Sequence, residues 1–176
     1  MKPFIALLLA TLAAGCQDTD GPASQEVQLG ALTFEVPADW QRHDAHQPGA
    51  LTSVWTPTPN PRHESVTVVR ADRPTHRADA GADVVGPQLV TASKALPGAR
   101  LLRYAPLSTG TGFAGARVDV RFRPAGVTRD YQRTHVVLVE DAATLVHVIY
   151  TAEAPDPAGK ATQLVLGSLA RPEVKS

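Results

Sequence analysis

Arginine is the chemically active residue type that gathers most densely in this sequence. Within a stretch of 17 residues it occurs five times, at Arg117, Arg121, Arg123, Arg129 and Arg133. A guanidinium group binds carboxylates and phosphates through paired N–H donors, so arginines on one face could contact an anionic ligand or a protein partner. The alternative interpretation is a solvated sheet face on which Asp119 pairs with one of the arginines.

The overall charge limits the kind of partner that these arginines could meet. The chain of 176 residues has 17 Lys+Arg and 17 Asp+Glu, so its formal net charge is zero. Binding to nucleic acids depends on an excess of Lys and Arg over acidic residues. We therefore expect no nucleic-acid partner.

Histidine is the second residue type with chemical potential. A loop of three residues, 141–143, would pair residue 140 with residue 144 and place His135 diagonal to His147 on one sheet face. Two imidazoles could bind a metal ion, but such a site needs a third or fourth ligand. No His-x-His or His-x₃-His pair supplies one, so we expect polar or hydrogen-bonded strand histidines and no metal site. The remaining histidines lie in predicted loops: His43, His46, His63 and His76.

Catalytic motifs are missing from the sequence. It contains no Gly-x-Ser-x-Gly nucleophile motif. The glycine-rich stretch 110–115 lacks the lysine and the following helix of a phosphate-binding loop. The single cysteine, Cys16, could not serve as a thiol nucleophile if it were acylated. We therefore expect no catalytic residues and no cofactor, and a protein that is not an enzyme.

The N-terminus has the pattern of an export signal. Lys2 precedes an apolar run over 4–14, which is shorter than the roughly 20 residues of a membrane-spanning helix. The end of this run, Leu12-Ala13-Ala14-Gly15-Cys16, resembles the bacterial lipobox, although Ala13 stands where that signal most often has Leu. The resemblance implies cleavage before Cys16 and acylation of its thiol. The alternative is a soluble exported protein in which Cys16 is an ordinary small residue.

The lipobox resemblance implies a location and a domain plan. Lipoproteins of this type carry several acyl chains, and stable attachment needs more than one. The protein would then face the periplasm of a bacterial cell envelope, anchored in a membrane, and Gln17 after the cysteine weakly favours the outer membrane. Residues 1–15 would be the signal peptide, 16–25 a flexible tether that contains Gly21-Pro22, and 26–172 the folded domain.

The elements that must position these side chains follow from hydrophobic periodicity. Residues 117–123 alternate between charged and apolar, which predicts a strand with one buried face and one wet face. Short connections over 117–151 predict a meander of three strands. The complete pattern is typical of an α+β domain with a mostly antiparallel sheet. Predicted strands cover 27–29, 32–36, 51–55, 65–70, 101–104, 117–123, 129–140 and 145–151, and predicted helices cover 80–96 and 157–170, the second with Asp156 as N-cap and Pro157 at its first position.

One segment resembles a known superfamily. The stretch Phe34-x-Val36-Pro37-x-x-Trp40 is typical of the first hairpin of the PsbP/Mog1/DcrB-like superfamily, and the order of elements over 26–170 is similar. The resemblance implies an α/β/α sandwich in which two main helices flank a central antiparallel sheet. It implies no shared chemistry, because members are accessory, scaffolding, chaperone or uncharacterised envelope proteins. From the residues alone, Phe34 and Val36 share a face and Trp40 folds back as an apolar plug.

These observations together predict an envelope lipoprotein of the binding or scaffolding type. Its partners would be the membrane, through the lipid, and an unknown envelope protein. The alternative is a domain that binds a small ligand or a secreted effector in a chaperone-like role. A concave apolar groove would favour the alternative, whereas a flat arginine face would favour the scaffold.

Overall fold

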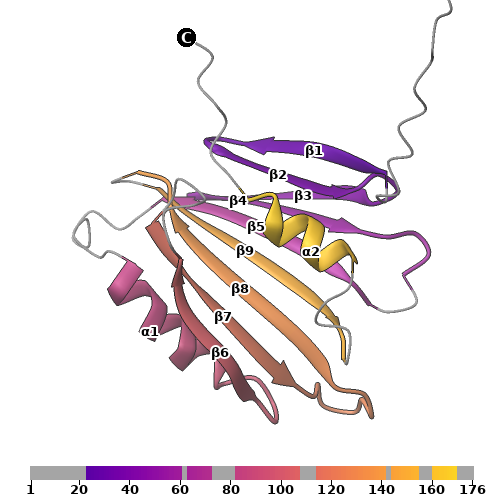
Figure 1. Ribbon diagram of the computed structural model, residues 1–176, viewed down its shortest axis with the longest axis vertical. Helices are drawn as coiled ribbons and strands as arrows, with labels where there is room; N and C mark the ends of the chain where they lie inside the picture. The colour runs from indigo at the N-terminus through magenta and orange to yellow at the C-terminus, as the bar shows by residue number, and fades with distance from the viewer. Residues whose placement is uncertain are drawn as a thin grey trace, which may run out of the picture.

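The computed structural model describes residues 23–60, 63–72, 82–107, 114–141, 144–154 and 160–169. These residues form strands and two helices, which Figure 1 shows along the chain. The strands are β1 (Ser24–Leu29), β2 (Leu32–Pro37), β3 (Gln41–Gln47), β4 (Ala50–Thr56), β5 (Ser65–Asp72), β6 (Arg100–Leu107), β7 (Ala114–Phe122), β8 (Tyr131–Val139) and β9 (Thr144–Glu153), and the helices are α1 (Ala82–Ser93) and α2 (Lys160–Gly167).

The strands form one large sheet and one hairpin. The large sheet has seven strands in the order β3-β4-β5-β9-β8-β7-β6, and every neighbouring pair is antiparallel. Strands β1 and β2 form a separate two-stranded antiparallel sheet. The predicted α+β class with a mostly antiparallel sheet is confirmed, and so is the meander, since β7, β8 and β9 are consecutive neighbours.

The main hydrophobic core lies on one face of the large sheet, which we call the core face. The β1–β2 hairpin and α2 cover it together (Figure 1). Phe34 of β2 packs edge-on against Trp55 of β4, with 5.3 Å between the ring centroids. Trp40 is buried in the same core, which confirms its predicted role as an apolar plug. Each such buried side chain contributes roughly 1.5–3 kcal/mol relative to an exposed one.

A buried carboxylate joins the hairpin to the sheet. Glu140, directly after β8, accepts the backbone N–H of Ala31 at 2.6 Å and the Nε–H of Arg70 at 2.7 Å. Gly30 in the same turn has a φ of 61°, and a Cβ there would lie 2.5 Å from the Glu140 carboxylate. Only glycine fits both the left-handed backbone and this close approach. We call the contact of Glu140 with Ala31 and Arg70 the hairpin bridge.

Helix α1 covers part of the opposite face, which we call the helix face. It contacts β6, β7 and β8. Its Gly86 lies against Tyr104 of β6, where a Cβ would come within 2.5 Å of the phenol oxygen. The small residue therefore lets the helix backbone approach the tyrosine closely.

The observed element ends differ from the predicted ones in ways that have physical reasons. Strand β3 was not predicted, because its residues are polar and it pairs on one side only, at the edge of the sheet. Strand β1 begins at Ser24, ahead of the expected domain start at residue 26, because Ser24 and Gln25 pair with the end of β2. Helix α2 covers Lys160–Gly167 of the predicted range 157–170, and the predicted N-cap Asp156 and first residue Pro157 lie outside the described residues.

Candidate functional site

The predicted arginines gather near one end of the large sheet, where β7 ends and β8 begins. Arg117 and Arg121 lie on the same face of β7, together with Asp119. Arg123 and Arg129 lie in the connection between β7 and β8. Three of these four arginines form ion pairs, and each partner is a carboxylate: Arg117 with Asp119 at 3.0 Å, Arg123 with Asp130 at 2.7 Å and Arg129 with Glu153 at 2.9 Å.

The charged face of β7 is less exposed to solvent than the alternation of charged and apolar residues predicted. Asp119 is buried, and besides Arg117 it accepts a hydrogen bond from the hydroxyl of Thr134 at 2.7 Å. Arg117 and Arg121 are half-buried. The predicted wet face is therefore only partly exposed, and the predicted pairing of Asp119 with one of the arginines is confirmed for Arg117.

Arg133 does not belong to the same surface as Arg121. It lies directly opposite Val120, so it projects from the helix face, while Arg121 projects from the core face. Its Nε donates to the hydroxyl of Thr151 at 3.1 Å, and its guanidinium lies 4.9 Å from the centre of the Phe122 ring. Burial lowers the pKa of Arg133 below its usual value. The predicted face of five arginines is corrected to one that excludes Arg133.

Arg121 forms no ion pair with any residue that the structure describes. Its Nε is buried and has no hydrogen-bond partner among the described residues. It lies directly opposite Arg100 of β6, and like charges in this position repel one another. Arg103 of the same strand is exposed. None of the three forms an ion pair within the described part of the chain, and we call Arg100, Arg103 and Arg121 the arginine corner.

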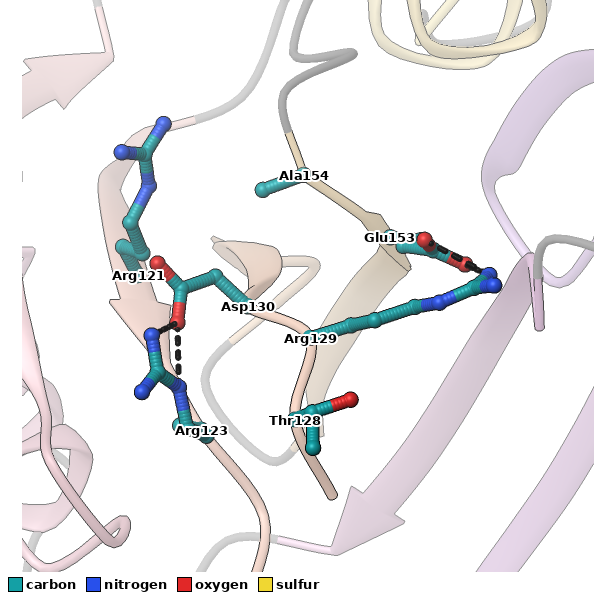
Figure 2. Close-up of a pocket in the computed structure, with 7 residues that line it drawn as sticks. All are labelled: Arg121, Arg123, Thr128, Arg129, Asp130, Glu153 and Ala154. Carbon is teal, nitrogen blue, oxygen red and sulfur yellow. Dashed lines mark hydrogen bonds and ion pairs between the residues drawn. The ribbon is translucent and has the colours of Figure 1, made fainter.

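Two hollows adjoin the arginine corner. One has a volume of about 370 Å³ and is lined by Gly98, Arg100, Arg121, Phe122, Arg123 and Asp130. The other, of about 320 Å³, is shown in Figure 2. There Arg123 and Arg129 each turn toward a carboxylate, whereas the guanidinium of Arg121 is joined to none of the residues drawn. An anionic group in either hollow would lie near Arg121, whose Nε has no hydrogen-bond partner among the described residues.

Sequence reasoning missed Arg100 and Arg103. They come before β7 in the chain and meet it only because β6 pairs along it. The predicted strand 101–104 was short and gave no pairing partner. A like-charged cross-strand pair has no signature in the local sequence, so only the register could reveal it.

The two strand histidines lie as the loop length predicted. His135 is diagonal to His147, since His147 pairs with Val137 and His135 with Ile149. The Nδ1 of His135 lies 2.9 Å from the Nε2 of His147, and the rings stack with their centroids 5.1 Å apart. Burial lowers the pKa of His135 to about 3 and that of His147 to about 4. At neutral pH the pair is therefore uncharged and shares one N–H.

An apolar hollow of about 360 Å³ lies beside this histidine pair, between α1 and the helix face of the sheet. Its polar lining residues are Gln88 and His147. Its apolar lining comes from Val69, Ala71, Leu89, Ala92, Val137 and Leu145. This volume is within the range of small-molecule sites. Among the described residues, no group of three or more His, Cys, Asp or Glu is placed to hold a metal ion.

The predicted lipidation site, Cys16, lies outside the described residues, together with the segment 1–15. Among the helices that the structure describes, none has the length and apolarity of a membrane-spanning segment.

Comparison with known proteins gives structural likeness only. No protein-family model matches the chain, and no curated protein matches it. The chain is similar to the Ran-binding protein Mog1p of Saccharomyces cerevisiae, with 13% identity and a TM-score of 0.53 over 86% of this chain and 96% of that one.

Two bacterial structures are also similar. LpqN of Mycobacterium tuberculosis, a protein involved in cell envelope biogenesis, has 14% identity and a TM-score of 0.47 over 85% of this chain and 91% of its own. PA94 of Pseudomonas aeruginosa, a protein of unknown function, has 24% identity and a TM-score of 0.42 over 73% of this chain and 82% of its own. The likeness to Mog1p shows that the chain has a fold like that of Mog1p.

Proposed function

We propose that this chain is a lipid-anchored protein of the bacterial cell envelope whose domain binds a partner protein and catalyses no reaction. The observation that carries the binding role is the arginine corner. Arg100 and Arg121 face one another across β6 and β7, and the buried Nε of Arg121 has no partner among the described residues. Repulsion between these like charges lowers the stability of the free protein. Such an arrangement is expected where a bound anionic group offsets the repulsion.

The partner's contact is an anionic group, because each hollow beside the corner is lined by more guanidinium groups than carboxylates. Arg117, Arg123 and Arg129 frame the corner and are already paired. The formal charge of the chain is zero, so attraction is confined to this corner and does not extend over the protein. A carboxylate on an envelope protein fits such a localised contact.

The anchor rests on the sequence around Cys16, and the domain architecture rests on the resemblance. The α/β/α sandwich is supported by helices on opposite faces of the sheet, with the β1–β2 hairpin sharing the layer of α2. We place the protein on the periplasmic side of a membrane, at the end of a tether that starts at Cys16.

Cross-linking in the native host tests the binding role. A photoreactive residue at Thr128, which is exposed and lines the hollow of Figure 2, would capture a partner seated on the corner. We expect Arg100→Glu with Arg121→Glu to abolish the captured species. The matched control, Arg42→Glu with Lys94→Glu, makes the same charge change elsewhere and should leave it. The same captured set in both variants would contradict the binding role, and turnover by the purified domain would contradict its non-catalytic nature.

Intact mass tests the anchor. Protein extracted from membranes should begin at Cys16 and carry added acyl mass, and Cys16→Ser should remove that mass and release the protein. An unmodified soluble product would show that Cys16 is an ordinary residue of an exported protein.

A second candidate function is binding of a small apolar ligand, and the hollow beside His147 favours it. It is concave and mostly apolar, with two polar side chains that could orient a ligand. A fluorescent apolar probe, anilinonaphthalene sulfonate, should bind the purified domain. Ala92→Trp, at the lining of the hollow, should displace it, whereas Lys94→Trp on the exposed end of the same segment should not.

A further inference from the structure

Strand β6 carries the exposed large apolar side chains of the described chain. The large apolar side chains that remain exposed are Leu101, Leu102 and Tyr104, each more than 40% accessible, and all of them lie on this one strand. Single exposed apolar residues are ordinary, but neighbours on one strand form a patch. Such a patch on a sheet edge marks a surface that pairs with another chain.

The backbone of β6 is also open on its outer side. The strand pairs with β7 and with no other strand among the described residues. The β6–β7 ladder has a β-bulge between Leu101 and Arg103 and is regular from Arg103 to Leu107. Pro106 lies opposite Ala116 in the regular part, and since proline has no N–H, this must be a pair without mutual hydrogen bonds. Tyr104, two residues earlier and opposite Val118, has the same orientation. Its N–H and C=O therefore point away from β7 and are available to an added strand.

The charges beside this edge select an acidic segment. Arg100 lies opposite Arg121, and Arg103 lies opposite Asp119, whose carboxylate is bound by Arg117 and Thr134. Within the described residues, none of these three corner arginines forms an ion pair. A second copy of this chain is a poor occupant, because two β6 strands side by side would bring the arginines of both copies together. A peptide with alternating carboxylates and apolar side chains satisfies both the arginines and the apolar patch.

We propose that β6 is a docking edge to which a partner protein adds an extended acidic segment as an eighth strand of the large sheet. Backbone hydrogen bonds to β6 would supply affinity. The arginine corner would bind the carboxylates, and the patch of Leu101, Leu102 and Tyr104 would cover the apolar side chains. The inference rests on the proposed binding function and adds the conformation of the bound partner segment, which is an extended strand.

A synthetic peptide tests this edge. The probe is a fluorescently labelled octapeptide of alternating Val and Glu, and its binding to the purified domain is followed by fluorescence anisotropy. An extended peptide has two edges, and N-methylation of alternate residues blocks one edge while keeping every side chain. We expect one of the two N-methylated series to lose at least about tenfold in affinity and the other to bind like the parent.

Variants of the protein test the chemistry. Arg103→Glu should weaken the peptide at least about tenfold, while Lys94→Glu, the same charge change on the segment after α1, should leave affinity within about twofold. Leu102→Ser should weaken it as well without lowering stability. A peptide with Lys in place of Glu should not bind.

Three outcomes would overturn the inference. Equal binding of both N-methylated series would show a contact through side chains alone, and the proposed binding function would stand. The peptide could fail to bind even at millimolar concentration while the arginine variants still abolish cross-linking at Thr128. That result would show that the arginine corner binds a partner without an added strand at β6. A protein that is dimeric in solution, and that becomes monomeric in Leu102→Ser, would show that a second copy occupies the edge.

Discussion

The two faces of the large sheet are covered in different ways. On the core face, the hairpin and α2 bury Phe34, Trp55 and their neighbours completely, and the hairpin bridge holds this layer in place. On the helix face, α1 leaves an apolar hollow and a buried pair of histidines, and it ends beside an exposed edge strand. The difference indicates that the covered part of the core face supplies stability. The helix face and the edge strand β6 are free to serve binding, and the arginines of the corner project from the core face at that edge.

The largest expected effect tests the stabilising role of the core face. Phe34→Ala removes a fully buried ring that packs on Trp55, so we expect a loss of about 3–5 kcal/mol in the free energy of unfolding. Leu89→Ala, at the hollow on the helix face, should cost less than about 1.5 kcal/mol, since its side chain is only half-buried. Urea unfolding measures both, and equal losses would remove the contrast between the faces.

The next effect concerns the hairpin bridge. Glu140→Ala leaves the Ala31 N–H and Arg70 without their acceptor, and we expect a loss of about 2–3 kcal/mol, reduced by the partial exposure of Arg70. Glu140→Gln keeps an acceptor for Ala31 and should lose less. The control Glu153→Ala, which breaks an ion pair with an exposed arginine, should lose least. Thermal unfolding of the three variants checks this order.

The histidine pair should make stability depend on pH. Both pKa values are lowered in the folded protein, from 6.5 to about 3 for His135 and about 4 for His147. Below about pH 6.5 the unfolded chain takes up protons that the folded pair does not, so stability falls as pH decreases toward 4. We expect a loss of about 2 kcal/mol between pH 6 and pH 5 from the two imidazoles together.

Urea unfolding at pH 7, 6 and 5 measures this dependence. His135→Leu with His147→Leu should flatten the curve in that interval. The control His43→Gln with His46→Gln removes the same number of imidazoles from the exposed strand β3 and leaves the pair intact. An unchanged slope in the leucine variant would show that the pair is not the source of the pH dependence.

The smallest effect on stability is expected at the edge of the sheet. Leu102→Ser removes an exposed side chain, so the free energy of unfolding should change by less than about 0.5 kcal/mol. If the strand serves binding, the same substitution lowers affinity for an acidic peptide while the melting temperature stays constant. A large loss of stability would assign Leu102 to the fold instead.

Local patterns predicted the parts of the fold that depend on neighbours in sequence. The alternation in 117–123 and the short loops over 117–151 correctly predicted the meander, and the loop after Glu140 correctly predicted the diagonal contact of His135 with His147. The burial of Trp40 followed from its place after the strand that ends at Pro37. In each case the residues that decide the structure lie close together in the chain.

Features that depend on register or on distant pairing could not be predicted. In β7 and β8, odd-numbered residues of one strand lie opposite even-numbered residues of the other, and this parity alone places Arg133 away from Arg121. Strand β3 carries no apolar alternation because both of its faces are exposed. The arginine corner depends on the pairing of Arg100 with Arg121, which lies beyond a register shift between Leu101 and Arg103 that the sequence pattern does not reveal.

The hairpin bridge has a consequence for the order in which the protein folds. Ala31 reaches its carboxylate 109 residues later in the chain, and the N–H of Glu35 reaches the hydroxyl of Ser168 across 133 residues. During synthesis, the first hairpin therefore emerges long before the residues that hold it. Contacts of such wide separation slow folding and leave apolar surface exposed meanwhile. A chain truncated before α2 would leave Phe34 and Val36 without their complete cover, so this layer closes only when the last helix arrives.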